Sequence, residues 1–451
     1  MSSTAFHCEL AWLGGAAAVA DVLVEVADGV ITDVRAGVPA PAGAVVLRGL
    51  TLPGFANAHS HAFHRALRGR THTGQGSFWT WRDQMYGVAE RLTPASYRAL
   101  ARAVYGEMVL AGMTVVGEFH YLHHDRNGVP YAQPNAMGEA LVAAAGEAGM
   151  RITLLDACYL HGGFATDGSL VAPNEVQRRF SDGSAAAWAE RVEALADTHR
   201  DDPMVRVGAA IHSVRAVDEF AMRAVAKWAN ERGAPLHAHV SEQPAENEQC
   251  LAAHGITPTG LLDVAGALTS RFTSVHATHL TPRDVERYQV RGCTVCFCPT
   301  TERDLADGIG PSSTLREAGV ALALGSDSHA IIDPFEDMRA LELNERLATL
   351  QRGNHESHDL LHAATAGGYR SLGWYDGGVL AVGAAADFVT VDLGSVRLAG
   401  TPAEHALAAV VYAASAADVH HVAVGGEVLV REGAHVRFDV AAELARVLEE
   451  L

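Results

Sequence analysis

The sequence predicts an α/β protein: a (β/α)8 TIM barrel with a small discontinuous β-sandwich domain formed by the N- and C-terminal segments. Between residues 51 and 327, short apolar runs alternate with amphipathic helical stretches. The runs are continuously apolar, as in a parallel sheet that is covered on both faces. Eight of them with intervening helices fit a closed barrel. A doubly wound sheet would need a glycine-rich phosphate loop after its first strand, and "PGFANAHSH" is not one.

The eight predicted strands follow one another along the chain. They cover residues 51–57, 113–121, 151–158, 205–213, 234–241, 272–278, 293–299 and 320–327. A helix is predicted over 95–112, because Leu100, Val104 and Met108 fall on one helical face. Gly112 is a suitable residue to end this helix.

The two ends of the chain differ from this central part. They contain short alternating runs separated by glycine turns, such as "VLVEVADGVITDVRA" and "HHVAVGGEVLVREG". Because both ends share this character, we expect them to pair with each other. The predicted domains are therefore a composite small β domain, residues 1–50 and 376–451, and a barrel over residues 51–375.

Charge and composition limit the possible partners. The formal net charge is −19, from 53 acidic and 34 basic residues, so we expect neither nucleic acid nor an anionic membrane surface as a partner.

The N-terminus lacks a basic segment followed by an apolar one, and no run of about 20 apolar residues occurs. Six cysteines in 451 residues do not make a disulfide framework. A reduced, cytoplasmic protein is expected.

Histidine and acidic residues gather at the predicted carboxyl ends of four strands, where barrel active sites lie. They are His59 and His61 after the first strand, His237, His239 and Glu242 after the fifth, His276 and His279 on the sixth, and Asp327 on the eighth. A single histidine in an apolar strand is usually a core residue, but His59 and His61 point to the same face of an extended chain. Neutral imidazoles with a carboxylate suit a catalytic Zn²⁺ or Fe²⁺. We interpret His59 and His61 as metal ligands, and His64, on the loop beyond, as a substrate contact.

Four stretches of the sequence resemble the motifs of the amidohydrolase superfamily, in particular its aminohydrolase (deaminase) branch. In chain order they are "PGFANAHSH", "HAHVSE", "SVHATHL" and "ALGSDS". The terminal β segments and "GVLAVGAAADFVTVDL" also resemble that superfamily, so the likeness spans nearly the whole chain. It implies a metal-dependent barrel. The residues that it implies are the ligands His59, His61, His239 and Asp327, with Glu242 and His276 acting on the reacting groups.

The single lysine of the chain bears on the number of metal ions. Binuclear members of the superfamily bridge their metals through a carboxylated lysine, typically on the fourth strand. Here that strand, "VRVGAAIHSV", has no lysine, and Lys227 belongs to the following helix. One metal ion per subunit is therefore expected, Zn²⁺ first and Fe²⁺ as the alternative.

The expected reaction is hydrolytic deamination of a C=N centre. Zn²⁺ makes its bound water more acidic. Asp327 would take the proton of that water, and Glu242 would deliver a proton to the imine or ring nitrogen. His276 would stabilise the attacking oxygen, and ammonia would leave.

Further residues suggest the substrate. Arg82 lies in "GSFWTWRDQMYG", Tyr121 in "EFHYLHH", and His212 and Arg215 in "AIHSVRAV". A surface ion pair for Arg82 and a core position for Tyr121 are the structural alternatives. Because arginine binds carboxylate through a planar fork, two arginines favour a substrate with two carboxylates.

These three stretches resemble the formimidoylglutamate deiminases of histidine degradation, which hydrolyse N-formimino-L-glutamate to N-formyl-L-glutamate and ammonia. The resemblance implies that Arg82, Tyr121, His212 and Arg215 bind the glutamate portion, a small dicarboxylate amidine, and that the protein is a homodimer. His64 stands where that family often has glutamine. A histidine there would add a pH dependence near its usual pKa of about 6.5.

Two other functions remain open. A nucleobase or nucleoside deaminase, of the guanine, cytosine or S-adenosylhomocysteine type, shares every metal motif. A non-catalytic relative is disfavoured because such relatives usually lose ligands. Cys293, Cys296 and Cys298 lack a nearby fourth zinc ligand, so we expect buried thiols rather than a zinc knuckle.

Overall fold

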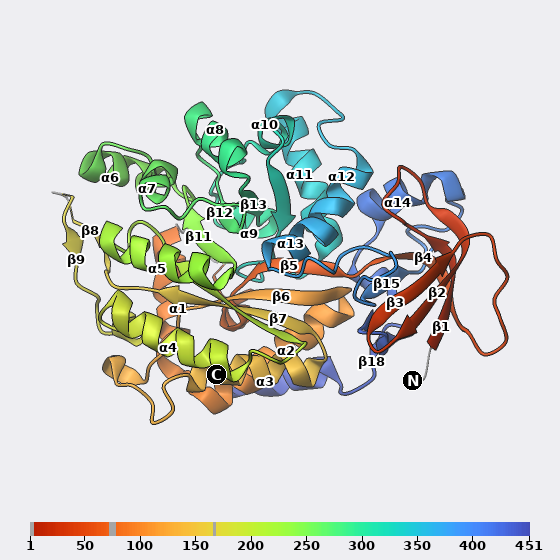
Figure 1. Cartoon of the computed structure of the whole chain (residues 1–451), viewed down its shortest axis with the longest axis horizontal. Coiled ribbons are helices and arrows are strands. Elements are labelled where there is room, and N and C mark those ends of the chain that lie inside the picture. The colour runs from red at the N-terminus through yellow and green to blue at the C-terminus, as the bar shows by residue number, and fades with distance from the viewer. Residues whose placement is uncertain (1–3, 72–77, 166–167) are drawn as a thin grey trace.

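A ring of eight parallel strands forms the centre of the computed structural model, which describes residues 4–71, 78–165 and 168–451 (Figure 1). The ring is closed where Ser60 and Asp327 form a parallel bridge, since the Asp327 amide donates to the His59 carbonyl at 3.0 Å. The order around the ring is the chain order, which confirms the predicted barrel. Its strands are β5 (Phe55–Ser60), β6 (Met113–His120), β7 (Arg151–Cys158), β10 (Val205–Ile211), β11 (Leu236–Val240), β12 (Phe272–His276), β13 (Thr294–Phe297) and β14 (Ala321–Leu324).

Helices surround the ring on its outer side (Figure 1). Among the described residues, no helix is long and apolar enough to cross a membrane. The main helices are α1 (Phe78–Arg91), α2 (Pro94–Leu110), α3 (Ala136–Ala148), α4 (Ala185–Thr198), α5 (Glu219–Arg232), α6 (Pro244–His254), α7 (Pro258–Val264), α8 (Pro282–Arg291), α9 (Pro299–Asp304), α10 (Ser312–Glu317), α11 (Pro334–Thr349), α12 (Ser357–His362) and α13 (Gly368–Ser371). Short 3-10 helices lie at η1 (Ala62–Leu67) and η3 (Gln177–Phe180).

Helix α2 shows how the local sequence sets these elements. Thr93 caps its first turn, with Ser96 completing a capping box. At the other end Gly112 has a φ of +90°, a conformation that glycine adopts without strain. The predicted face is buried in the core, so the helix over 95–112 is confirmed to within two residues.

The two chain ends form one mixed eight-stranded sheet beside the barrel (Figure 1). Its order is β18-β17-β16-β15-β4-β1-β2-β3, and β15 pairs with β4, so that segments far apart in sequence become neighbours. Apolar side chains of both ends share one core, among them Phe6, Val24 and Phe388. The strands are β1 (Thr4–Ala11), β2 (Val19–Ala27), β3 (Val30–Arg35), β4 (Val45–Pro53), β15 (Phe388–Val391), β16 (Val419–Val424), β17 (Glu427–Arg431) and β18 (Ala434–His435).

The strand predicted over 51–57 belongs to two different sheets. Residues up to Pro53 lie in β4 of the terminal sheet, and the first barrel strand begins only at Phe55. The chain changes sheets at Gly54, where a Cβ atom would lie 2.1 Å from Thr114 Oγ1. Both halves are apolar and buried, so hydrophobicity alone did not separate them.

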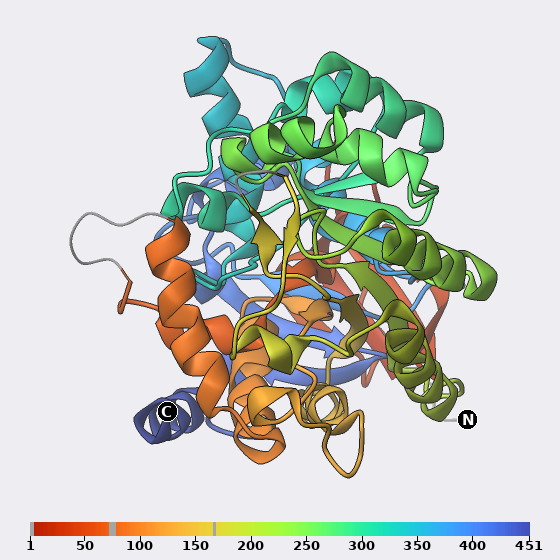
Figure 2. The ribbon, with the colours of Figure 1, turned by 90° about the vertical axis from the view of Figure 1, so that its left-hand side faces the viewer.

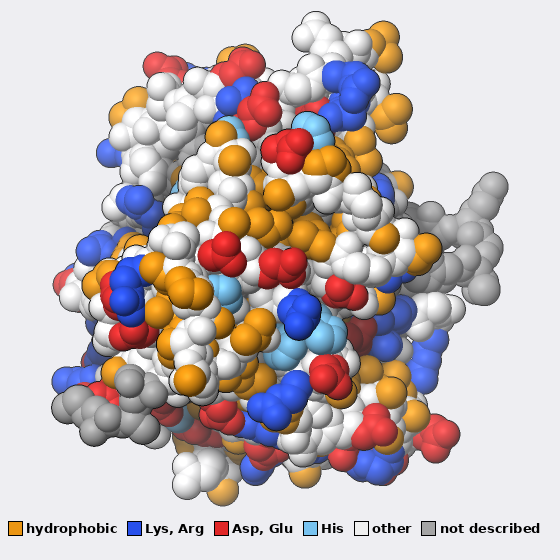
Figure 3. Space-filling model, turned by 90° about the vertical axis from the view of Figure 1, so that its right-hand side faces the viewer, with side chains coloured by type: hydrophobic (Ala, Val, Ile, Leu, Met, Phe, Trp, Pro, Cys, Tyr) orange, Lys and Arg blue, Asp and Glu red, His pale blue; other side chains and the backbone are white. Residues whose placement is uncertain are grey.

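One side of the molecule carries mixed charge. Figure 3 shows the side at the right of Figure 1, where acidic, basic and apolar side chains are interspersed. The opposite side is shown in Figure 2, where the hairpin of β8 (Gly163–Phe164) and β9 (Leu170–Val171) crosses the middle of the view and α1 appears to its left. Elements of this second side contribute the side chains of the cavity described next.

Candidate active site

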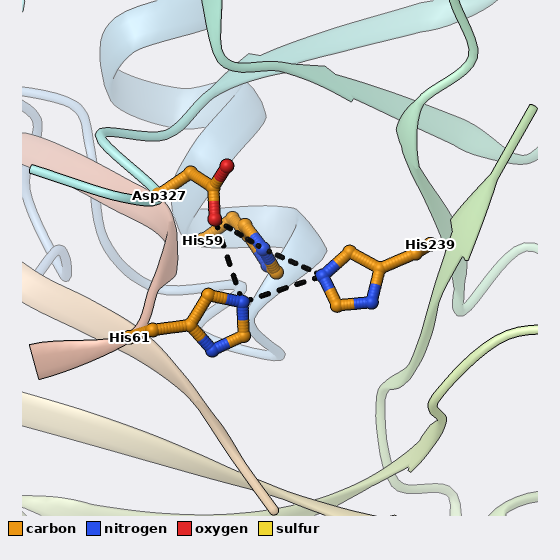
Figure 4. Close-up of side chains that lie close together, drawn as sticks. All are labelled: His59, His61, His239 and Asp327. Atoms are coloured by element: carbon orange, nitrogen blue, oxygen red, sulfur yellow. Dashed lines mark hydrogen bonds and ion pairs between the residues drawn. The ribbon is translucent and has the colours of Figure 1, made fainter. Parts of the chain in front are cut away.

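Four buried side chains converge where the barrel closes (Figure 4). The Nε2 atoms of His61 and His239 are 3.3 Å apart, and those of His239 and His59 are 3.1 Å apart. Asp327 Oδ1 lies 3.3 Å from His59 Nε2 and 3.4 Å from His61 Nε2. These are the four residues that the sequence predicted as metal ligands.

Backbone carbonyls orient two of the imidazoles. His61 Nδ1 donates to the Phe119 carbonyl at 2.9 Å, and His239 Nδ1 donates to the His212 carbonyl at 2.9 Å. With the ring proton on Nδ1, both Nε2 atoms point their lone pairs into the cluster. Two such lone pairs 3.3 Å apart repel each other unless a cation lies between them, so this donor set fits a metal ion.

Burial also sets the protonation that ligands need. Desolvation lowers the pKa of His59, His61 and His239 and so keeps these imidazoles neutral at neutral pH. Burial alone would raise the pKa of Asp327, but its hydrogen bond with His59 and the positive charge of the nearby His276 outweigh burial and hold that pKa well below its ordinary value. Three neutral imidazoles and an ionised carboxylate suit Zn²⁺.

Glu242 and His276 lie beside this cluster. His276 Nε2 is 3.8 Å from Glu242 Oε1 and 3.9 Å from Asp327 Oδ2, and its Nδ1 is 3.4 Å from Glu302 Oε1. Burial opposes charge on His276, but Glu242, Glu302 and Asp327 together raise its pKa well above the ordinary value. Burial raises the pKa of Glu242 despite His276 and Arg215 nearby.

Three residues at the same strand ends have a strained backbone conformation. Ser241, His276 and Asp327 have φ values of +53°, +69° and +43°, which are costly for residues with a Cβ atom. Of these three residues, His276 and Asp327 line the cavity described next.

A cavity opens from the cluster, with an empty volume of about 590 Å³ that includes space open to solvent. All five residues predicted to bind substrate line it: His64, Arg82, Tyr121, His212 and Arg215. Its other lining residues are His61, Trp81, Met85, Tyr86, Tyr159, Phe180, His239, Glu242, His276, Leu305 and Asp327.

Three contacts involve the residues that were predicted to bind substrate. Arg215 forms an ion pair with Glu246, Nε to Oε2 at 3.0 Å, and its Nη2 lies 3.9 Å from Glu242 Oε2. His64 Nε2 is 2.9 Å from the Tyr121 hydroxyl. Burial lowers the pKa of His64 to about 3, which argues against the predicted pH dependence near 6.5.

Several aromatic residues that line the cavity were not predicted from the sequence. Tyr159 directly follows β7, so its position at a strand end is the sequence signal that points to it. Tyr86 and Phe180 come from α1 and η3, where no periodicity pointed to them. Gln177 Nε2 donates to the hydroxyls of Tyr86 at 3.0 Å and Tyr159 at 2.8 Å.

The other residues named in the sequence analysis lie outside this cavity. His237 bonds to the Ser371 carbonyl at 3.0 Å, and His279 to the Asp307 carbonyl at 2.8 Å. Lys227 is largely exposed and pairs with Glu231 on α5. The predicted buried thiols are found as free cysteines: Cys293, Cys296 and Cys298.

The sequence of this chain is similar to those of several known proteins. Residues 50–429 match the model of the amidohydrolase family. A formimidoylglutamate deiminase of Pseudomonas aeruginosa is 36% identical over 438 residues, 94% of each chain. A 5-methylthioadenosine/S-adenosylhomocysteine deaminase of Natronomonas pharaonis is 30% identical over 386 residues, 85% of this chain and 82% of that protein.

Solved structures agree with the fold. The crystal structure of an amidohydrolase from Brucella melitensis matches with a TM-score of 0.91 and 33% identity and covers 99% of both chains. An adenosine deaminase from Xanthomonas campestris with bound zinc has a TM-score of 0.85 and 26% identity, over 99% of this chain and 97% of that one.

Proposed function

Because the chain belongs to the amidohydrolase family, we propose that it is a zinc-dependent deiminase that hydrolyses N-formimino-L-glutamate to N-formyl-L-glutamate and ammonia. One observation carries the proposal: two arginines, Arg82 and Arg215, line the same cavity as the His/Asp cluster, Glu242 and His276. Such a cavity can hold a carboxylate-bearing substrate with its amidine carbon next to the metal ligands. The similarity to a formimidoylglutamate deiminase supports the same choice.

Members of the family depend on metal, and His59, His61, His239 and Asp327 would hold the ion. When bound, Zn²⁺ supplies an acidified water and a positive charge near the reacting carbon. The exposure of Lys227, the one lysine of the chain, supports a single ion, since no lysine is available to bridge two. Fe²⁺ is the alternative that these ligands allow.

The remaining steps belong to the side chains. Asp327 presents Oδ1 to the imidazoles and Oδ2 toward His276, so Oδ2 can accept the proton of the attacking water. Glu242, whose pKa burial raises, donates a proton to the imine nitrogen and makes the carbon more electrophilic. His276, kept cationic by its carboxylate neighbours, stabilises the developing oxyanion. Proton transfer to the amine then releases ammonia.

Recognition of the glutamate portion falls to the cationic and hydroxyl groups of the wall. Arg82 and Arg215 would each take a carboxylate oxygen, with Tyr121, His64 and His212 donating further hydrogen bonds. Because Arg215 is already paired with Glu246, its guanidinium is oriented before substrate arrives.

The test is ammonia release by zinc-loaded protein on a panel of N-formimino-L-glutamate, N-formimino-L-aspartate, guanine, cytosine and S-adenosylhomocysteine. Efficient turnover of formiminoglutamate is expected. Failure on it, with turnover of a ring substrate, would reject the proposed activity while leaving the metal chemistry in place.

A nucleobase or nucleoside deaminase is the second candidate. Aromatic side chains line the cavity at Trp81, Tyr86, Tyr159 and Phe180, and such rings stack on planar bases. The similarity to a 5-methylthioadenosine/S-adenosylhomocysteine deaminase favours this class as well. The arginines argue for the first candidate, because a neutral base has no carboxylate for them to bind.

A further inference from the structure

A network of buried hydrogen bonds lies behind the His/Asp cluster. Its members, called the buried network below, are Asn57, Ser60, Glu118, Ser326 and His329, and all five are fully buried. Side chains alternate along an extended strand, so Ser60 points away from the face to which its neighbours His59 and His61 point. None of the five lines the cavity, and the proposed reaction uses none of them.

Glu118 of β6 holds the residues on both sides of His61. Its Oε2 atom accepts a hydrogen bond from the Ser60 hydroxyl at 2.7 Å. Its Oε1 atom accepts a hydrogen bond from the Ala62 amide, also at 2.7 Å. One carboxylate therefore fixes the chain immediately before and immediately after a metal ligand.

Ser326 and His329 connect the end of β5 to the segment that carries Asp327. Asn57 Nδ2 donates to Ser326 Oγ at 2.7 Å, and the Ser326 amide donates back to Asn57 Oδ1 at 2.9 Å. The His329 ring lies between the two serines, with Nδ1 2.9 Å from Ser326 Oγ and Nε2 3.2 Å from Ser60 Oγ. The buried network thus joins the two strand ends that meet where the barrel closes.

The hydrogen bonds of the buried network fit one consistent direction of donation. With the ring proton on Nε2, His329 donates to Ser60 and accepts from Ser326. Ser60 in turn donates to Glu118, while Ser326 accepts from Asn57. Each hydroxyl then gives one hydrogen bond and accepts another. Removal of one member leaves buried partners unsatisfied, so these bonds depend on one another.

His59 is the ligand that depends most on this support. His61 and His239 each donate from Nδ1 to a backbone carbonyl, which orients their rings. His59 Nδ1 is buried and has no hydrogen-bond partner within the residues that the structure describes. The position of its ring therefore depends on packing and on the backbone of β5, where Asn57 and Ser60 form their bonds.

We propose that the members of the buried network are positioning residues for His59, His61 and Asp327, and that they set the affinity of the cluster for Zn²⁺. The inference rests on the metal part of the proposed function and not on its substrate. Groups that hold metal ligands in place typically contribute about 10- to 100-fold in metal affinity. The buried network acts through the ligands, because none of its members belongs to the cluster itself.

Ser60→Ala is the first variant, because it removes one hydroxyl from the middle of the buried network and changes the volume little. The dissociation constant for Zn²⁺ is measured on metal-free protein by competition with a chromophoric chelator. We expect this constant to rise by about 10- to 100-fold. The visible absorption of the Co²⁺-loaded protein should also change, because these bands follow the geometry of the ligands.

Ser274→Ala is the matched control. Ser274 is a fully buried serine of β12, and its hydroxyl bonds to the Tyr288 hydroxyl at 2.8 Å, outside the buried network. Both variants lose a buried hydrogen bond, so both should lower the unfolding temperature of the metal-free protein. Only Ser60→Ala should weaken zinc binding. Equal dissociation constants in the two variants would overturn the inference.

Ser326→Ala tests the other end of the buried network and covers the case in which Ser60→Ala does not fold. It should also weaken zinc binding by about 10- to 100-fold. In the double variant, the loss of binding free energy should be smaller than the sum of the two single losses, because both substitutions break the same network. Additive losses would show two independent effects and overturn the network.

Zinc binding by the wild-type protein separates this inference from the proposed function. Wild-type protein that binds no zinc would reject the metal part of the proposed function together with the inference. Zinc binding by wild type with unchanged constants in both serine variants would reject the inference alone. Zinc binding that depends on Ser60, in a protein inactive on formiminoglutamate, would support the inference and reject the proposed substrate.

Discussion

Two parts of the cavity are built differently. The strand-end cluster (His59, His61, His239, Glu242, His276 and Asp327) stands at the carboxyl ends of β5, β11, β12 and β14. The loop-borne wall (Trp81, Arg82, Met85, Tyr86, Phe180 and Leu305) comes from α1, η3 and the end of α9. Sheet hydrogen bonds, such as that from the Asp327 amide to the His59 carbonyl, fix the cluster directly.

The wall depends instead on side-chain contacts between connecting segments. Gln177, for example, joins Tyr86 of α1 to Tyr159, which follows β7. In barrel enzymes the strand ends commonly carry the catalytic groups while the connections vary with the substrate, and the proposed function assigns the two parts of this cavity the same roles. Changes in the cluster should therefore abolish chemistry or metal binding, whereas changes in the wall should alter affinity with the metal retained.

The largest effect is expected from His239→Ala. It removes a ligand, and loss of the ion's several kcal/mol of charge stabilisation corresponds to about 10³-fold or more in kcat. Zinc content by mass spectrometry should fall together with activity. His237→Asn, on the same strand but away from the cluster, should keep its zinc; equal zinc loss in both variants would contradict the assignment.

Glu242→Gln should separate chemistry from metal binding. The amide cannot donate an acidic proton, so kcat should fall by about 10²- to 10⁴-fold while zinc content stays at one equivalent. Steady-state ammonia release and metal analysis measure both quantities. A kcat near that of wild type would remove Glu242 from the proton transfer.

Arg215→Met probes the recognition of carboxylate. Losing a charge-assisted hydrogen bond of about 1.5–3 kcal/mol should lower kcat/KM for formiminoglutamate by about 10- to 150-fold, mostly through KM. The variant also leaves Glu246 buried without its partner. The double variant Arg215→Met, Glu246→Gln should recover thermal stability but not affinity, which distinguishes substrate binding from structural support.

Gln177→Met tests the loop-borne wall through a residue that is buried behind it. The side chain loses its hydrogen bonds to the hydroxyls of Tyr86 and Tyr159, about 0.5–1.5 kcal/mol each, together with those it forms with the Asn174 amide and the Gly162 carbonyl. KM should therefore rise by a few-fold to about tenfold, because Tyr86 and Tyr159 lose their fixed orientation. The kcat should change by less than about threefold. A large fall in kcat with KM unchanged would tie these tyrosines to the chemistry instead.

The smallest effect is expected in the pH profile of His64→Gln. Since burial lowers the pKa of His64 to about 3, this imidazole is already neutral above pH 5 and gains no proton between pH 5 and 8. The shape of kcat/KM against pH should therefore match that of wild type across this range. A pH dependence lost on substitution would show that His64 titrates.

Sequence patterns alone predicted much of the strand-end cluster. Histidines spaced two residues apart at a strand end, and acidic or imidazole residues after three other strands, follow from the alternation of side chains in extended chain. The closed ring then brings these ends together, so strand position was sufficient to group them. The resemblance to a known superfamily supplied the roles.

Other features were decided only by tertiary structure. The division at Gly54 depends on the pairing of β4 with β15 from the far end of the chain, which a local apolar run does not encode. Tyr86 and Phe180 face the cavity because α1 and η3 pack over the same end of the barrel. The low pKa of His64 likewise arises from burial by residues distant in sequence.

The sequence by itself predicted the barrel and the absence of a bridging lysine from local patterns and residue identity, and its resemblance to the superfamily pointed to the four residues that the structure brings together. Only the folded chain decided that Arg215 is paired with Glu246, that Gln177 joins two tyrosines, and that Asp307 lies beside Glu242 and His276. These depend on distances between segments far apart in the chain, which local periodicity cannot specify.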